Sequence, residues 1–487
     1  MGKTTVIYKD VAVGAANAAS VTATGQTQES DLTKIPFGAE TKKAITLERN
    51  RWTLNGTFDT CYTNGQYAFW SSEISNENGE FQNQPVITIS FPKQFSSMGV
   101  SITFDAATGE YCSSVNVKWY QGTTLKADQD YAPDNAQYFC AKRVESYDKI
   151  IITLKKTVLP YRRAKINAIL FGVVREFGME ELRSATITNQ MNEISAELPV
   201  STFKWVLNSK SDVDYMFQLK QPVEAWNNGN LLGVFYIEDS SRTSDRIYSI
   251  NCKDALGVLD GSAFSGGAYL SGISAKSLLS SLAAPFQVEY ADGVSDKTLK
   301  GIIQAGTNRS AIQQVMFAWG VCLATDGGDT LRVFNQPTVP TEIPKSRTYT
   351  GASVKTSSIV TGVRVSAHTY IADASGGITI NGVKYKDTET VYSVSNPNVT
   401  ANDRANIKEI RSATLVSTDI GQETAQRVYD YYVKRNTSSA KVVYGGEKLG
   451  DCVSIYTPWD TLISGNLHKM DITLSNTVAY KAEVIGA

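Results

Sequence analysis

The stretch PVEAWNNGNLLGVFYIEDSSRTSDRIYSINCKDALGVLD, residues 222–260, decides how the rest of the chain is interpreted. Residues 231–237 are rich in branched and aromatic side chains, and they predict a strand. Residues 246–252 alternate between apolar and polar side chains, as a strand facing a core on one side does. The polar residues 238–245 between them predict an exposed hairpin loop. A short apolar turn, residues 254–260, leaves the sheet. The stretch carries no catalytic pattern, so we interpret it as scaffold.

Length and composition predict a soluble protein rich in β structure. The chain has 487 residues, enough for about three domains of ordinary size. Hydrophobic residues make up 42% and charged residues 20%, and the 24 Tyr and 36 Gly favour strands and turns. The net charge is −1, with 47 Lys and Arg against 48 Asp and Glu. That balance excludes a global electrostatic field that would hold nucleic acid or an anionic membrane.

The cysteines and the N-terminus exclude two further classes. The six cysteines are too far apart for a CxxC or zinc pattern, and we expect buried free thiols at positions 61, 112, 140, 252, 322 and 452. The first residues, MGKTTVIYKD, lack the apolar core of a signal peptide. No apolar run reaches the roughly 18 residues of a membrane helix. We therefore expect no membrane insertion, and synthesis and assembly in the cytoplasm.

The first third of the chain predicts an arm followed by a β-sandwich. Residues 1–42 are interpreted as an N-terminal arm, in which residues 4–9 can form a first strand. Residues 11–31 have no hydrophobic period and are expected to stay loose until assembly. Short strands separated by turns recur over residues 43–172, which favours a sandwich. Three segments resemble a discoidin-type, galactose-binding-like jelly roll: PVITISF at 85–91, VNVKWYQG at 115–122 and YDKIIITLKKTVLPYRRAKINAILFG at 147–172.

Helix signals cluster farther along the chain. Ser274 is expected to cap a helix over 275–284 that Pro285 ends. Thr307 or Asn308 is expected to cap a second helix. Asp419, with Gln422 three residues on, predicts a third. Each of the last two helices carries an apolar stripe that predicts a buried face, Ile312, Val315, Met316 and Trp319 in one and Ala425, Val428, Tyr429 and Tyr432 in the other.

Six segments, taken in order, resemble the hub proteins of phage-type tails, a family that includes the N-terminal structural module of tail-associated lysins. They are QPVEAWNNGNLLGVFYIEDSS, RIYSINCKDALGVLD, SAKSLLSSLAAPFQVEY, RSAIQQVMFAWGVCLATDGGDTLRVF, AQRVYDYYVKR and LGDCVSIYTP. The resemblance implies a mainly β chain whose N-terminal jelly-roll sandwich precedes a hub module. In that module a small α+β insert, residues 259–345, separates two tube-like β-barrels at residues 173–258 and 346–487.

What the resemblance implies about function is a structural role in the tail of a virion. Family members are trimers, and their six barrels form a pseudo-sixfold ring that joins a hexameric tail tube to the tip or spike. The expected partners are two further copies of the chain, tail-tube or distal tail proteins, and a tip, spike or tape-measure protein. DNA would meet the chain only by passing through the lumen. The same architecture occurs in contractile injection systems and tailocins, and the sequence does not separate these from a phage.

Two groups of residues are candidates for contacts. The polar hairpin tip is expected at a rim or subunit boundary, which makes Arg242 and Arg246 candidates for assembly. The alternative function is binding of a host glycan, for instance a cell-wall polysaccharide, by the N-terminal sandwich. Aromatic rings stack on sugars as readily as they fill cores. The candidates for a sugar platform are Trp52, Trp70, Tyr120 and Arg163, whereas Trp119 is expected in the core and the sandwich is equally well a spacer.

A search for catalytic chemistry finds none. The two histidines, His368 and His468, lie about a hundred positions apart, and we interpret each as structural. The patterns HExxH, GxSxG, GxGxxG and GxxxxGK[ST] are absent. Glu73, Glu77 and Glu80 form either a solvated face or a weak calcium site. We predict no enzyme, no catalytic residues, no metal and no cofactor.

Overall fold

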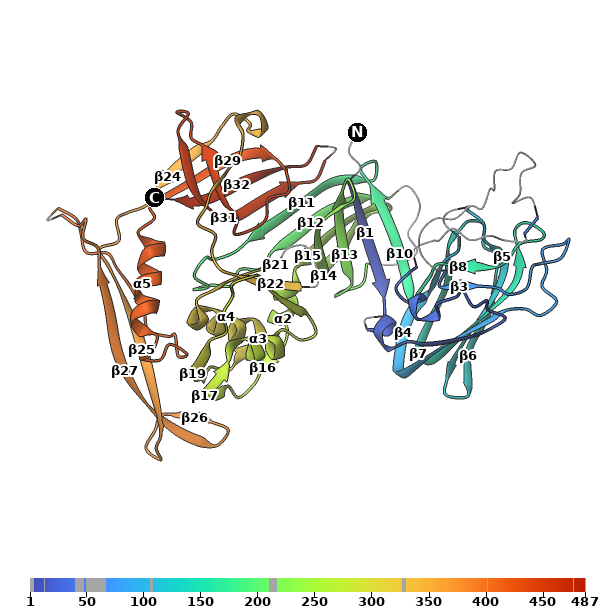
Figure 1. The fold of residues 1–487 in the computed structure, drawn as a ribbon, viewed down its shortest axis with the longest axis horizontal. Coiled ribbons are helices and arrows are strands. Elements are labelled where there is room, and N and C mark those ends of the chain that lie inside the picture. Colours follow the sequence, from blue (N-terminus) through green and yellow to red (C-terminus); the bar gives the residue numbers. More distant parts are fainter. Residues whose placement is uncertain are drawn as a thin grey trace. The chain divides into compact units, whose positions relative to one another are not determined.

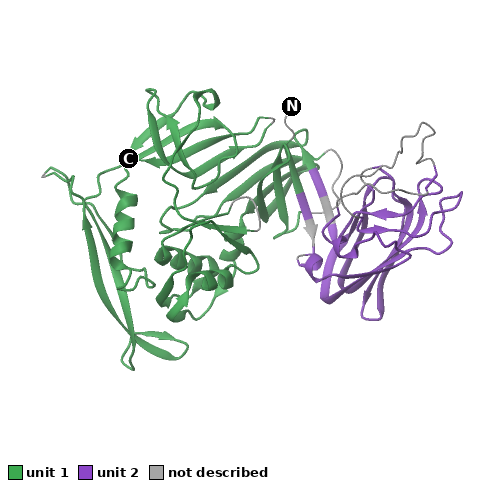
Figure 2. Cartoon of the chain, viewed as in Figure 1, with its two compact units in different colours: residues 1–7, 177–487 green, residues 8–176 purple. Residues whose placement is uncertain are grey.

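The chain folds into two compact units in which most of the regular structure is β (Figures 1 and 2). Unit 1 contains residues 1–7 and 177–487, and unit 2 contains residues 8–176. The computed structural model describes residues 4–12, 14–39, 48–49, 67–105, 108–209, 217–325, 330–400, 402–475 and 477–486.

Unit 2 is built around a sheet with the strand order β2-β4-β7-β5-β6, in which β9 also pairs with β4. A second, two-stranded sheet pairs β3 with β8. The strands are β2 Ser20–Thr24, β3 Phe69–Trp70, β4 Val86–Thr103, β5 Cys112–Gln121, β6 Thr124–Tyr131, β7 Gln137–Thr157, β8 Lys165–Ile166 and β9 Ala168–Leu170. The short helix α1 Ala15–Ala18 and the 3₁₀ helix η1 Leu32–Lys34 precede them or lie between them.

The central strands of unit 2 are longer than their sequence pattern predicts. Separate strands are expected at 86–91 and 100–104, but β4 runs through both, and β7 likewise joins 136–141 to 149–154. The pairing of β4 with β7 absorbs three register shifts between Ser90 and Gly99. Gly99 has φ +143°, and a Cβ there would lie 2.2 Å from the carbonyl oxygen of Cys140. Only glycine fits this bend, so the strand continues where the periodicity stops.

Strand β1 Thr4–Val11 forms where a first strand is predicted, but residues 11–31, predicted to stay loose, also contain regular structure. Strand β2 pairs antiparallel with β4, from Ser20↔Ser90 to Thr24↔Val86. Ala15 and Ile35 are fully buried in the core of unit 2. Alternating Ser, Thr and Ala side chains carry a weak periodic signal, but a strand at the margin of a sheet needs mainly backbone hydrogen bonds.

Unit 1 contains most of a 13-stranded sheet. Strands from both predicted barrel segments, residues 173–258 and 346–487, contribute to this sheet. Its main path is β10-β1-β13-β14-β15-β12-β11-β31-β32-β29-β24, and β30 pairs with β31 and with β23. The strands are β1 Thr4–Val11, β10 Gly172–Gly178, β11 Leu182–Gln190, β12 Thr202–Asn208, β13 Pro222–Asn227, β14 Asn230–Ser244, β15 Ile247–Lys253, β23 Thr341–Glu342, β24 Ser353–Thr356, β29 Asn436–Val443, β30 Cys452–Tyr456, β31 Leu462–Thr473 and β32 Ala479–Gly486.

One strand pair joins the two β segments. Strands β11 and β31 pair antiparallel from Thr186↔Thr473 to Gln190↔Lys469, and Thr188 donates a side-chain hydrogen bond of 2.8 Å to Asp471. The resemblance implies two tube-like barrels. Over the part of the chain that the structure describes, the strands of both barrels are hydrogen-bonded along one path, whose terminal strands are β10 and β24.

The predicted α+β insert is only part of a larger module. Residues 255–334 pack together with residues 360–432, which the sequence places inside the second barrel, and we call the two segments the composite module. Its helices are α2 Ala255–Asp260, α3 Ala275–Ala283, α4 Asn308–Trp319 and α5 Gly421–Tyr432. Its strands are β16 Ala263–Phe264, β17 Ala268–Ser274, β18 Gln287–Tyr290, β19 Thr298–Ile303, β20 Gly306–Thr307, β21 Cys322–Thr325, β22 Thr330–Phe334, β25 Gly362–Ala372, β26 Ile378–Ile380, β27 Val383–Ser395 and β28 Ile407–Ile410. The 3₁₀ helix η2 Lys345–Arg347 lies in the linker between the two segments.

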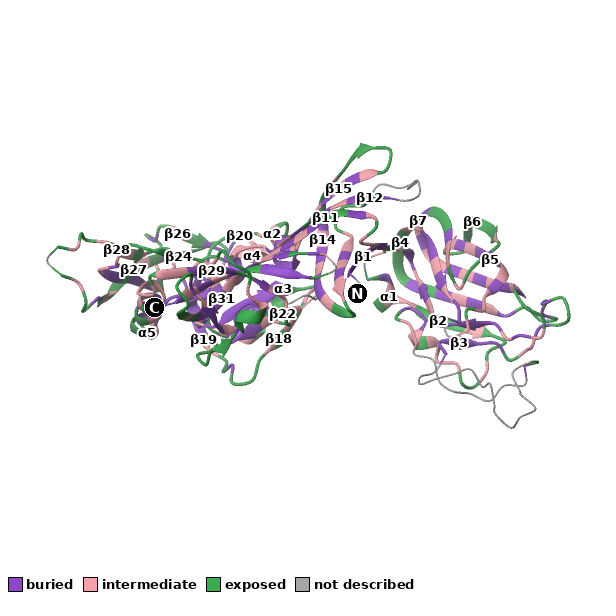
Figure 3. Ribbon diagram, turned by 90° about the horizontal axis from the view of Figure 1, so that it is seen from above, coloured by how far each residue is buried: buried purple, intermediate pink, exposed green. Residues whose placement is uncertain are grey.

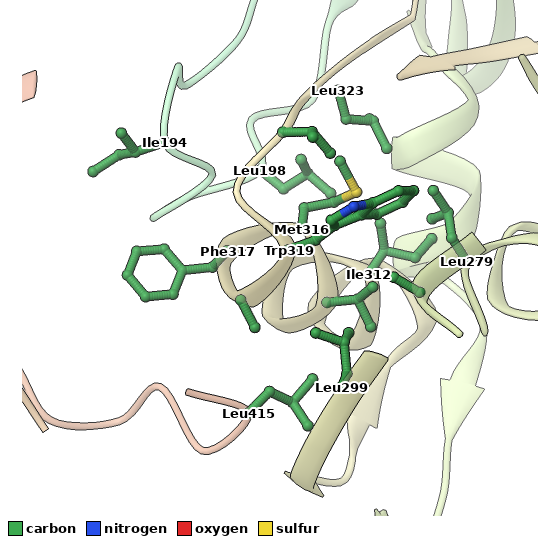
Figure 4. Close-up of a cluster of buried hydrophobic side chains, with 14 of the residues drawn as sticks. Ile194, Leu198, Leu279, Leu299, Ile312, Met316, Phe317, Trp319, Leu323 and Leu415 are labelled. Carbon is green, nitrogen blue, oxygen red and sulfur yellow. The ribbon is translucent and has the colours of Figure 1, made fainter. Parts of the chain in front are cut away.

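The core of the composite module surrounds α4. Ile312, Val315, Met316 and Trp319 are buried, as their helical spacing predicts. Figure 4 shows that side chains from both segments gather around this helix, among them Leu279, Leu299, Leu323 and Leu415. The second segment contributes strands β25 to β28 and helix α5 to the module (Figure 1).

Two of the three predicted helix caps are confirmed, and one is wrong. The Ser274 hydroxyl accepts a hydrogen bond from the Ser277 N–H at the start of α3. Thr307 caps α4 in a reciprocal capping box with Ser310. Helix α5, however, begins after Ile420 without a side-chain cap. Asp419 instead forms an ion pair of 2.7 Å with Lys300, a partner far away in sequence.

The described cysteines are free thiols, as expected. Cys112, Cys140, Cys252 and Cys322 are buried, and burial raises the pKa of each of these thiols to about 12. Cys452 is half-buried, and Cys61 lies outside the described residues. None of the described helices is long and apolar enough to cross a membrane.

Candidate assembly surfaces

The hairpin of β14 and β15 is longer than its sequence predicts. Residues 238–245 are expected to be a loop, but β14 continues to Ser244 and only Asp245 and Arg246 form the turn. Cross-strand pairing extends to Ser244↔Ile247, with two register shifts on the way. Asn251 also donates a 2.7 Å side-chain hydrogen bond to Asp239. Polar side chains form a strand here because backbone pairing and a solvated surface outweigh low strand propensity.

The two arginines predicted to act in assembly are exposed at the end of this hairpin (Figure 3). The Arg242 guanidinium lies 5.4 Å from the ring centroid of Tyr248 and donates to the carbonyl oxygens of Ser244 and Asp245. The Arg246 backbone carbonyl accepts the Ser209 N–H at 2.9 Å. The structure therefore places Arg242, on β14, and Arg246, in the turn, at the exposed end of one hairpin, where a partner surface can reach them.

A buried carboxylate anchors the other end of the hairpin. Asp254 follows β15 directly and caps α2 by accepting the Gly257 N–H at 3.0 Å. It also accepts the Ser201 N–H at 3.0 Å and the Thr325 hydroxyl at 2.8 Å. Burial raises the pKa of Asp254 because the charged carboxylate loses water, although these hydrogen bonds favour the charged form. The hairpin base is thereby tied to the composite module.

A wide groove lies beside β24, the strand that ends the sheet path. The groove has a volume of about 1050 Å³. Five basic residues and one acidic residue, Asp403, line the groove. The Lys408 ammonium lies 5.6 Å from the ring centroid of Tyr432. Such a lining favours an acidic partner segment. The basic residues are Lys355, Arg404, Lys408, Lys434 and Arg435.

The three glycan candidates that the structure describes, Trp70, Tyr120 and Arg163, do not form a shared exposed platform. Trp70 is only 4% exposed, and a buried ring offers no face to a sugar. Tyr120 is half-buried on β5, where the Lys149 ammonium lies 5.0 Å from its ring centroid. Arg163 is half-buried and donates to the carbonyl oxygens of Ser71 and Ser72. Trp119 is fully buried, and Trp52 lies outside the described residues. Glycan binding therefore stays a prediction, for which the described residues of unit 2 show no common site.

Unit 2 instead holds buried ion pairs that the sequence does not reveal. The Lys165 ammonium lies 2.9 Å from a carboxylate oxygen of Glu48 and 3.9 Å from one of Asp105, and all three side chains are at most 2% exposed. Arg162 pairs with Glu110 at 2.8 Å. Buried charges of this kind are retained only with partners. We interpret them as structural, because each cation has a carboxylate in direct contact.

The structure also shows the surroundings of Glu73, His468 and His368. Glu73 accepts the backbone N–H groups of Gln82 at 2.5 Å and Asn83 at 3.0 Å, so its carboxylate holds the loop. His468 lies 3.8 Å from Glu483, and burial lowers the pKa of its imidazole. His368 is not alone as the sequence suggests, because it contacts Asp387 at 2.9 Å.

No protein-family model matches the sequence, and no curated protein matches it either. Several solved structures have a similar fold. A tail protein from Neisseria meningitidis MC58 is 13% identical, with a TM-score of 0.46 over 64% of this chain and 93% of that chain. A 43 kDa tail protein of prophage MuSo2 from Shewanella oneidensis is 11% identical, with a TM-score of 0.45 over 64% and 95%. A prophage tail protein from Listeria monocytogenes EGD-e is 12% identical, with a TM-score of 0.43 over 63% and 91%. These likenesses are to the fold alone.

Proposed function

We propose that this chain is a structural subunit of a phage-type tail, and that three copies form a hub ring joining the tail tube to the tip or spike. The proposal begins from the ordered sequence segments that resemble tail hubs. The pairing of β11 with β31 supports it, because it joins both β segments of one chain into a single sheet. A sheet of this kind has terminal strands that further copies of the chain can continue.

The β24 end of the sheet is the surface we assign to contact with a second copy. Residues 353–356 form a short terminal strand that is mostly exposed, and Lys355 and Thr356 also line the basic groove. Short, charged terminal strands discourage indiscriminate pairing. A partner copy that supplies an acidic segment would satisfy both the backbone edge and the groove.

Oligomeric state and particle symmetry test the proposal. We expect light scattering on the tag-free chain to give three times the 53.1 kDa chain mass, and electron microscopy with tube protein to show a ring. Lys355→Glu should weaken the trimer, whereas Lys384→Glu, on the exposed part of β27, serves as a matched control. A chain that stays monomeric at high concentration and never joins tube protein would overturn the proposal.

The proposal assigns the chain no catalytic role, and zymography on bacterial peptidoglycan should show no clearing. Binding of a host glycan by residues 8–176 stays the alternative prediction. A screen of the full chain against wall polysaccharides tests it, with loss of binding in Tyr120→Ala as the expected result for a site on β5.

A further inference from the structure

His368, Asp387 and Glu389 lie on one face of the β25–β27 sheet, although two of them are about twenty residues from the third. His368 on β25 is directly opposite Glu389 on β27, and Asp387 is opposite Tyr370. Residues directly opposite in an antiparallel pair share a face, and so do residues two apart on one strand. The register therefore brings one imidazole and two carboxylates together.

The three groups are close enough to share a cation. One ligand atom from each residue lies within 4.8 Å of the others. Metal–ligand bonds of about 2.0–2.2 Å to nitrogen and carboxylate oxygen place neighbouring ligand atoms about 3–4 Å apart. Asp387 Oδ2 is 2.9 Å from His368 Nδ1. Glu389 is exposed, so its side chain is free to close the remaining gap.

The His368 imidazole is oriented by a hydrogen bond from one ring nitrogen to a carbonyl oxygen, as metal-binding histidines usually are. Its Nε2 lies 2.9 Å from the carbonyl oxygen of Arg411. A carbonyl only accepts, so Nε2 carries the proton, and in the neutral ring Nδ1 then presents its lone pair toward Asp387. The His368 backbone N–H donates to the Val416 carbonyl at 2.7 Å, and the residue is 5% exposed. The ring position, with Nδ1 as the nitrogen that faces Asp387, is thereby set before any ligand arrives.

The carboxylate beside it has unused capacity. Asp387 Oδ1 is buried and accepts no hydrogen bond from the described residues. A buried carboxylate oxygen without a partner is costly, and a cation is the partner that most directly removes this cost. An imidazolium–carboxylate pair without metal would satisfy Nδ1 and Oδ2, but it would leave Oδ1 unpartnered.

We propose that His368, Asp387 and Glu389 bind a divalent transition-metal ion, with Zn²⁺ as the best match to one imidazole nitrogen and two carboxylate oxygens. The ion links β25 to β27 and, through the Arg411 carbonyl, to the segment that follows β28. The role of the ion is to stiffen the pairing of β25 with β27 in the composite module. This inference is independent of the proposed tail function, because it rests on contacts within one chain.

Metal titration of the full-length, tag-free protein tests the site. After treatment with a chelator, we expect one equivalent of Co²⁺ to bind, to give visible absorption bands, and to be displaced by Zn²⁺. Glu389→Gln should weaken Zn²⁺ binding at least tenfold, and Asp387→Asn should abolish it. Glu289→Gln changes an exposed glutamate on β18 and should leave binding unchanged.

The variants are chosen so that misfolding cannot imitate the result. Glu389 is exposed and neutral replacement keeps its size, so circular dichroism should stay unchanged. Zn²⁺ should also raise the melting temperature of the wild type and of Glu289→Gln more than that of Glu389→Gln. The inference is overturned if the wild type takes up no stoichiometric metal, or if Glu389→Gln and Glu289→Gln bind equally. The first result would leave an imidazolium–carboxylate pair as the explanation of the cluster.

Discussion

Two long hairpins of unit 1 are built from similar strands but are used differently. The β14–β15 hairpin is polar and mostly exposed from Glu238 to Arg246, and it is held there mainly by the pairing of its two strands. The β25–β27 hairpin buries Val363, Val365 and Ala367 in the composite core, with α5 against it. What packs on a strand, and not its length, therefore decides whether it serves as core or as surface.

A substitution in the segment between β28 and α5 should have the largest effect on stability. Leu415 is 1% exposed and packs in the composite core. We expect Leu415→Ala to lower the free energy of unfolding of this core by about 2–5 kcal/mol, because it leaves a cavity. Leu462→Ala removes the same atoms at a site that is 44% exposed, and it should cost less than about 0.5 kcal/mol. Chemical denaturation of both variants checks this, and equal losses would contradict the assignment of Leu415 to the core.

The link from α5 to α4 should give the next effect. Arg427 donates to the Phe317 carbonyl oxygen in the last turn of α4, and burial lowers the pKa of its guanidinium to about 10. A cation there is favoured by the helix dipole. Arg427→Ala should cost about 1–3 kcal/mol, as for a lost hydrogen bond to a charged group. Arg411→Ala, at a side chain that is 73% exposed, is the control. Thermal unfolding in which both variants melt alike would argue against this link.

The base of the first hairpin should show a pH dependence. The pKa of Asp254 is raised in the folded state, so the folded chain holds this proton more tightly than the unfolded chain. Its contribution to stability is therefore full below the unfolded carboxyl pKa of about 3.9 and is lost as pH rises through the folded pKa. Asn keeps an oxygen that can accept the Gly257 N–H. We expect Asp254→Asn to gain stability relative to the wild type as pH rises from 4 to 8 in denaturation experiments. A difference that stays constant with pH would contradict the raised pKa.

The tip of the first hairpin should give the smallest effect on folding. Arg242→Glu combined with Arg246→Glu changes exposed charges, so the free energy of unfolding should change by less than about 0.5 kcal/mol. Assembly should weaken instead, and sedimentation at several protein concentrations measures it. Lys126→Glu together with Arg143→Glu reverses two exposed charges of unit 2 and serves as the control. Normal assembly of the tip variant would rule out Arg242 and Arg246 as assembly residues.

The sequence by itself determined the features whose cause lies within a few residues. The caps at Ser274 and Thr307 depend on hydrogen bonds from side chains to nearby N–H groups. The buried stripe of α4 and the two strands of the β14–β15 hairpin depend on the local periodicity of apolar residues. The mainly β class follows from the same signals repeated along the chain. The arginines of the hairpin tip were also placed at the surface by local polarity.

Only the tertiary structure decided what depends on contacts between distant residues. Asp419 forms an ion pair with Lys300 and does not cap α5. Residues 360–432 belong to the composite module because their apolar side chains pack into the same core as those of α3 and α4. The cluster of His368, Asp387 and Glu389 exists because of the register between β25 and β27. Periodicity shows that a face is buried but not what buries it, since that choice is made by all apolar surfaces of the folded chain together.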